Sequence, residues 1–162
     1  MLVSKVAKPT LYGFQALDER RVLIESLARM GLQLGANDVR QLRRALFEDE
    51  AVSRDEAMAL FALERAQKGR TCTEWTEFFV ECVTEHLVWQ SRPTGVVNNE
   101  QAEWLIRECD ATCSANAYAL LAYVLASAHR APQWLPPAAR NRLEAPQAQI
   151  ALAEAAQIEA TA

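Results

Sequence analysis

Residues 50–63 of the chain read EAVSRDEAMALFAL. Within this segment Ser53 and Glu56 have the spacing of a capping box, in which each side chain accepts a hydrogen bond from the other residue's backbone N–H. Apolar residues then follow at the three- and four-residue steps of a buried helix face, namely Ala57, Leu60, Phe61 and Leu63. The segment therefore predicts an amphipathic helix that begins at Ser53.

A second segment repeats this pattern. Residues 95–106 read GVVNNEQAEWLI, in which Asn98 aligns with Ser53 and Gln101 with Glu56. Asn and Gln can exchange the same capping hydrogen bonds through their amides. Because an amphipathic stretch precedes each capped segment, the sequence predicts a duplicated helix-loop-helix unit.

Length and composition agree with a helical fold. The chain has 162 residues, is 51% hydrophobic and 23% charged, and contains only 5 Gly and 6 Pro. So few turn-forming residues argue against a β-sandwich or barrel. We expect an all-α, single-domain bundle of about six to eight helices. The bundle is expected to span residues 1–145, with repeat units at about 37–69 and 73–109, followed by an Ala-rich helix or tail at 146–162.

Charge and hydropathy narrow the classes of partner. The net charge of -4 gives no overall attraction to nucleic acid or to anionic membranes. The first residues show no secretory signal, and no stretch approaches the roughly 20 apolar residues of a membrane span. We therefore expect a cytoplasmic protein, with another protein as its partner and nucleic acid disfavoured.

The first capped segment resembles a known motif. Residues 49–56 match the Asp-Gly-x-apolar-Ser-x-x-Glu signature of TerB-like helical domains, which occur in tellurite-resistance TerB proteins and in DjlA-type co-chaperones. Asp49, Ser53 and Glu56 occupy the matching positions, whereas Glu50 stands where the family has Gly. The resemblance implies an all-helical bundle with acidic interhelical loops, associated with metal in the tellurite-resistance branch.

The second copy departs from the signature in the opposite way. Gly95 matches the family's glycine, but Thr94 and Gln101 replace the two acids. The resemblance covers about residues 37–109, and within it the chain is similar to alphaproteobacterial proteins of this general shape. This similarity implies no activity.

The first loop is the candidate metal site. Ca²⁺ and Mg²⁺ prefer several oxygen ligands, and five carboxylates fall within nine residues here: Glu48, Asp49, Glu50, Asp55 and Glu56. The candidate ligands are Asp49, Glu50 and Glu56. Acids also gather at a helix N-terminus because they complement its dipole, so the expectation is no cofactor, with a divalent cation as the alternative.

An acidic row is the candidate partner-binding surface. Glu77, Glu81 and Glu85 recur at four-residue steps along a helix predicted from Thr73 to Trp89. Such a row would suit a basic partner protein. The sequence has neither a Gly-x-Ser-x-Gly nucleophile motif nor a Gly-rich phosphate loop, which favours a non-enzymatic adaptor or stress-associated protein.

DNA binding is the remaining alternative. Arg40, Arg43 and Arg44 lie on one predicted helix that a short loop joins to the next, as in a helix-turn-helix. The acidic residues of that loop oppose a phosphate backbone. A DNA-binding regulator is therefore the third hypothesis.

Overall fold

The computed structural model describes residues 13–31, 33–46 and 51–161, and these form an all-α bundle, as predicted. The described part contains no strand, only an isolated bridge between Val96 and Arg130. Its helices are α1 (Gly13–Met30), α2 (Ala36–Leu46), α3 (Arg54–Gln67), α4 (Thr73–Thr84), the π-helical turn η3 (Glu85–Trp89), α5 (Asn99–Thr112), α6 (Ala115–Ser127), α7 (Leu135–Leu143) and α8 (Pro146–Thr161).

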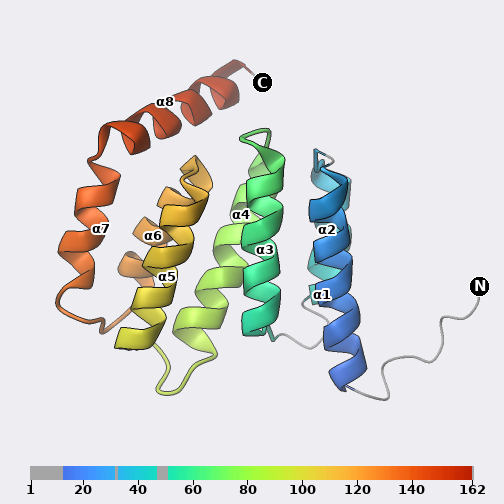
Figure 1. Cartoon of the computed structure of the whole chain (residues 1–162), viewed down its shortest axis with the longest axis horizontal. Helices are drawn as coiled ribbons and strands as arrows, with labels where there is room; N and C mark the ends of the chain where they lie inside the picture. The colour runs from blue at the N-terminus through green and yellow to red at the C-terminus, as the bar shows by residue number, and fades with distance from the viewer. Residues whose placement is uncertain (1–12, 32, 47–50, 162) are drawn as a thin grey trace, which may run out of the picture.

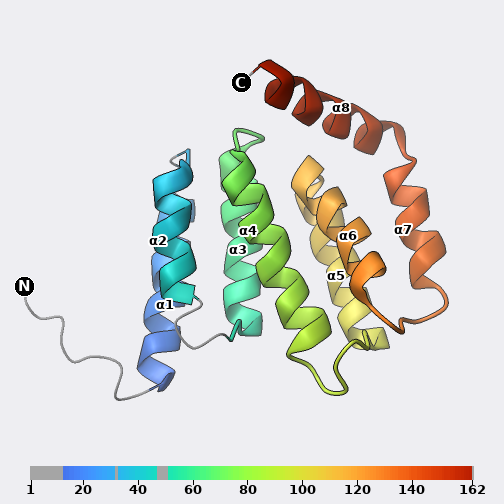
Figure 2. The same cartoon turned by 180° about the vertical axis from the view of Figure 1, so that it is seen from behind.

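The helices α1 to α7 lie side by side, whereas α8 runs across one end of them (Figure 1). After α7 the chain turns and α8 crosses over one end of the bundle, above the loop between α3 and α4 (Figure 2). α8 packs on α6 and α7, where Ala148 is fully buried. The expected Ala-rich C-terminal segment is therefore a helix that covers part of the bundle end.

Both capping boxes form as predicted. Ser53 Oγ accepts from the Glu56 backbone N–H at 3.1 Å, and Glu56 Oε1 accepts from the Ser53 N–H at 2.9 Å. Asn98 and Gln101 exchange the corresponding bonds, both at 2.8 Å. These bonds satisfy N–H groups that the first turn of a helix leaves without partners. They set where α3 and α5 begin, while the duplication of the unit stays a prediction.

Removal of either cap is expected to destabilise the protein. Ser53→Ala and Asn98→Ala should each lower the free energy of unfolding by about 1 kcal/mol, because an N–H of the first turn loses its acceptor. Urea unfolding followed by far-ultraviolet circular dichroism measures this. Thr73→Ala is the control: Thr73 is exposed, and α4 has no side-chain cap, so its cost should stay within about 0.5 kcal/mol. Equal costs for all three variants would contradict the capping role.

The helix predicted from Thr73 to Trp89 is interrupted. Its α-helical part ends at Thr84, and a π-helical turn comes next, in which the Gln90 N–H donates to Glu85 O at 2.9 Å. A π-turn accommodates one extra residue within the helix. Leu87 and Val88 are buried in this turn. The apolar pattern predicted a helix here but did not distinguish the π-turn from a regular α-helix.

The core is a continuous apolar cluster with aromatic rings at its centre. The Phe61 ring of α3 meets Phe79 of α4 edge to face at 5.1 Å between centroids, and Trp104 of α5 at 5.7 Å. These contacts hold the three helices together. None of the described helices combines the length and the apolar character needed to cross a membrane.

Candidate functional site

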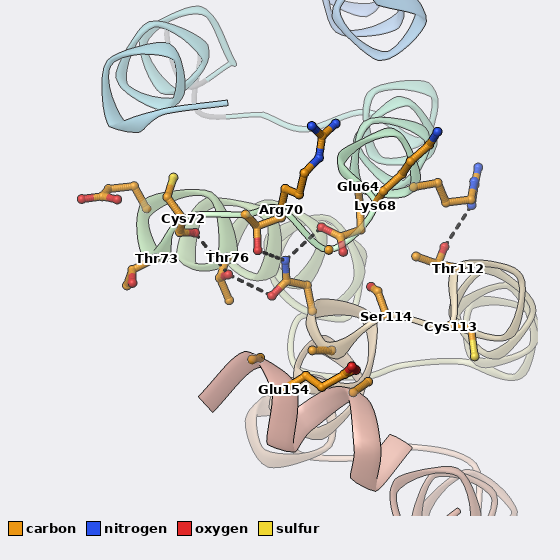
Figure 3. Close-up of a pocket in the computed structure, with 18 residues that line it drawn as sticks. Glu64, Lys68, Arg70, Cys72, Thr73, Thr76, Thr112, Cys113, Ser114 and Glu154 are labelled. Carbon is orange, nitrogen blue, oxygen red and sulfur yellow. Dashed lines mark hydrogen bonds between the residues drawn. The ribbon is translucent and has the colours of Figure 1, made fainter. Parts of the chain in front are cut away.

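An open cleft of about 920 Å³ lies at the end of the bundle that α8 covers (Figure 3). Its walls come from the α3–α4 loop, the start of α4, the α5–α6 junction and one face of α8. Glu64 and Asn116 line it from α3 and α6, and Ala151, Glu154 and Ala155 line it from α8. Segments that are far apart in the sequence therefore meet there.

Glu64 lies on the buried face of α3. It follows Leu60 by one helical turn, on the apolar side of the helix, and only 2% of its surface is exposed. A buried carboxylate requires hydrogen bonds to offset the loss of water. Helix packing supplies them here from two neighbouring helices.

Five side chains form a hydrogen-bonded network at the base of the cleft, including Thr71, whose Oγ1 accepts from Asn116 Nδ2 at 3.4 Å. Glu64 Oε1 accepts from Trp75 Nε1 at 2.7 Å and from Asn116 Nδ2 at 2.9 Å. Asn116 Oδ1 in turn accepts from Thr76 Oγ1 at 2.8 Å. The network ties α3, α4 and α6 together.

The second oxygen of Glu64 has no such partner. Both of its protein donors bind Oε1, and within the described ranges no residue donates a hydrogen bond to Oε2. Neither donor carries a charge, because one is an indole and the other an amide. Within the described part of the chain, Glu64 at the base of the cleft therefore has no cationic hydrogen-bonding partner.

The charged side chains around the cleft point in different directions. Lys68 and Arg70 are exposed at the rim and point away from α8, whereas the Glu154 side chain leaves α8 on the side that lines the cleft (Figure 3). Arg65 also lines the cleft, where its Nη1 donates to Thr112 Oγ1 at 3.0 Å. Glu64 and Glu154 thus bring carboxylates to the cleft from α3 and α8, and Arg65 brings a cation to its α5 side.

A thiol lies at the α5–α6 edge of the cleft. Cys113 ends α5 with a left-handed backbone, and its Sγ lies 2.9 Å from Tyr118 Oη. This hydrogen bond raises the pKa of Tyr118 to about 12. Tyr118 is therefore a neutral hydrogen-bonding group at physiological pH.

The candidate metal ligands are only partly described. Asp49 and Glu50 lie outside the described residues. Glu56 is fully buried and its carboxylate serves the capping box. Among the described residues no group of three or more His, Cys, Asp or Glu side chains is placed to hold a metal ion, and the metal site stays a prediction.

The acidic row of α4 is divided by the packing of α2. Glu77 is exposed, but Glu81 forms an ion pair with Arg43 of α2, and Glu85 is half-buried within the π-turn. The Arg43 guanidinium also lies 5.3 Å from the centre of the Phe78 ring. Glu81 therefore helps to join two helices, and binding of a partner by the row stays a prediction.

The arginines of α2, which the sequence offered for DNA binding, also differ in their surroundings. Arg43 faces α4, while Arg40 and Arg44 are exposed. α2 packs on α4 and buries Val39 and Leu42. DNA binding by this helix stays a prediction.

Sequence reasoning missed both Glu64 and Asn116. The signal in the sequence was a polar residue at a position that the helical period places on the buried face. Glu64 follows Leu60 by one turn of α3. Asn116 precedes Leu120 by one turn of α6. A polar group at such a position needs partners from other helices. The sequence does not show which helices supply them.

No protein-family model matches the chain, and no similar protein was found among curated proteins or solved structures. The resemblance to TerB-like domains therefore stays a prediction. Any functional conclusion has to come from the geometry of the cleft.

Proposed function

We propose that this protein is a non-enzymatic helical adaptor that binds a segment of a partner protein in the cleft below α8. The observation that carries the proposal is the cleft itself, an open volume of about 920 Å³ whose base is a buried polar network. Binding sites are typically concave, with a few oriented polar groups among apolar ones. The opening on the bundle end leaves room for a chain segment to enter.

The roof of the cleft supports a binding role. The cleft face of α8 carries small residues, Ala151 and Ala155, at one helical turn from each other. Small side chains leave space between α8 and the rest of the bundle. The rigid core on the other side holds the polar base in a fixed position.

A peptide selection tests the proposal. Peptides enriched from a displayed random library on the immobilised full chain should bind with measurable affinity by isothermal titration calorimetry. Ala155→Trp, which fills the cleft from its roof, is expected to weaken their binding at least about tenfold, because the indole occupies the space that the peptide needs.

Ala153→Trp is the matched control. Ala153 lies on the same helix but is exposed and does not line the cleft, so this variant should bind like the original protein. Unfolding curves of the two variants should agree. Failure to enrich any peptide, or enriched peptides that bind Ala155→Trp normally, would refute the proposed site.

A further inference from the structure

We propose that the group held at the base of this cleft is the cation of a lysine or arginine side chain, bound between the carboxylates of Glu64 and Glu154. The inference rests on the proposed function of the cleft and adds the chemistry of its ligand. Three observations lead to it: the Oε2 atom of Glu64, to which no described residue donates, the placement of Glu154, and the orientation of the rim cations.

Among the described residues, no cationic side chain bonds to Glu64. Its side chain is 2% exposed, its two donors are neutral, and both bind Oε1. An N–H of an ammonium or guanidinium group at Oε2 would add the attraction between opposite charges to the hydrogen bond. A neutral donor could fill the position but would leave the charge uncompensated.

Glu154 supplies a second carboxylate from the opposite wall. It is exposed on α8 and lines the cleft (Figure 3), and Ala151 and Ala155 of the same helix line it too. A long aliphatic side chain can pass along these small residues while its charged end reaches Glu64. The two acids come from α3 and α8, so the cation would also hold α8 to the bundle.

The nearby protein cations do not satisfy either carboxylate. Arg65 follows Glu64 in the sequence, yet it pairs with Glu108 at 3.6 Å and donates to Thr112. Lys68 and Arg70 are directed away from α8 (Figure 3). A cationic ligand therefore meets acids inside the cleft without displacing an internal ion pair among the described residues.

The experiment uses short peptides as probes. An acetylated, amidated alanine pentapeptide with one central lysine, its arginine counterpart and its Nε-acetyl-lysine form are titrated into the full chain labelled with ¹⁵N. The Trp75 indole N–H signal, assigned from its loss in Trp75→Phe, reports on the Glu64 carboxylate because it donates to that group. We expect the charged peptides to shift this signal and the acetylated peptide to leave it unchanged.

Two variants locate the cation. Glu64→Gln keeps the shape of the side chain and an acceptor for Trp75 and Asn116, but places an amide N–H₂ where the cation would bind. Glu154→Gln changes an exposed residue of α8 and keeps the size of its side chain. Each should weaken binding of the charged peptides about tenfold. Glu77→Gln removes one negative charge outside the cleft. It should change the affinity for the charged peptides by no more than about twofold.

The outcomes separate the two proposals. If peptides from the library bind in the cleft but acetylation of lysine has no effect, the cation assignment is wrong while the adaptor function stands. If Glu154→Gln bound the charged peptides as tightly as the original protein, the proposed binding of the cation between Glu64 and Glu154 would be wrong. This test holds even if Glu64→Gln does not fold. If Glu77→Gln weakened binding of the charged peptides as much as Glu154→Gln does, the loss would reflect only the net charge of the protein. That result would contradict the assignment of the cation to the cleft.

Discussion

Trp75→Ala is expected to lower the free energy of unfolding by about 3–5 kcal/mol. The Trp75 side chain is fully buried, and its ring lies 5.8 Å from the centroid of Phe79 in a stacked arrangement. Truncation leaves a cavity among these rings. It also removes one of the two donors to Glu64, so a buried carboxylate loses part of its compensation.

Two controls separate these contributions. Trp75→Phe keeps much of the ring contact but not the hydrogen bond, and should cost about 1–3 kcal/mol. Trp134→Ala removes a tryptophan that is 37% exposed and donates to Asn99, at a cost of about 1–2 kcal/mol. Urea unfolding followed by far-ultraviolet circular dichroism gives all three values. A cost for Trp75→Ala no larger than that for Trp134→Ala would show that the network does not organise this end of the bundle.

Gly95→Ala is expected to cost about 2–4 kcal/mol, because it combines backbone strain with a steric overlap. Gly95 has a φ of +80°, in the left-handed region that side chains disfavour. A Cβ added there would overlap Cδ2 of the His129 imidazole and lie 3.3 Å from its Cγ. The backbone cannot shift freely, since Gly95 O accepts from the N–H groups of His129 and Arg130 at 2.8 and 3.2 Å.

Gly69→Ala is the matched control for Gly95→Ala. Gly69 has the same φ of +80°, but a Cβ there would meet no atom within 4 Å, so only the strain of about 1–2 kcal/mol remains. Adding His129→Ala to Gly95→Ala should recover the part due to overlap but not the part due to φ, and a double-mutant cycle measures that coupling. Equal thermal unfolding midpoints for Gly95→Ala and Gly69→Ala would contradict the steric argument.

The helical architecture could be predicted because its signals are local. The first turn of α3 depends on Ser53 and Glu56, which are three positions apart and bind each other as the spacing predicts. The apolar steps behind the cap likewise place Leu60 and Phe61 in the core. Local spacing did not distinguish the π-turn at Glu85–Trp89 from a continued α-helix, because a single five-residue turn is too short to show a period of its own.

For the predicted partner-binding surface, the spacing of residues along the helix does not show which acid forms an ion pair within the protein. Glu77 and Glu81 both fall on one face of a helix, and the sequence treats them alike. Packing of α2 pairs Glu81 with Arg43 and leaves Glu77 exposed. The position of a neighbouring helix, rather than the periodicity of α4, decides that Glu81 forms this ion pair.

By itself the sequence determined an all-α chain, the residues at which its capped helices begin and most of the buried helix faces. These features depend on capping hydrogen bonds between residues three positions apart and on the helical period, and neither requires a residue that is distant in the sequence. Only the tertiary structure decided the cleft. Glu64 and Asn116 are 52 positions apart and become hydrogen-bonding partners because α3 and α6 both pack on α4. Glu154 lines the same space because α8 crosses the bundle end. Whether a buried acid has a partner depends on the directions of separate helices, and no local spacing encodes those directions.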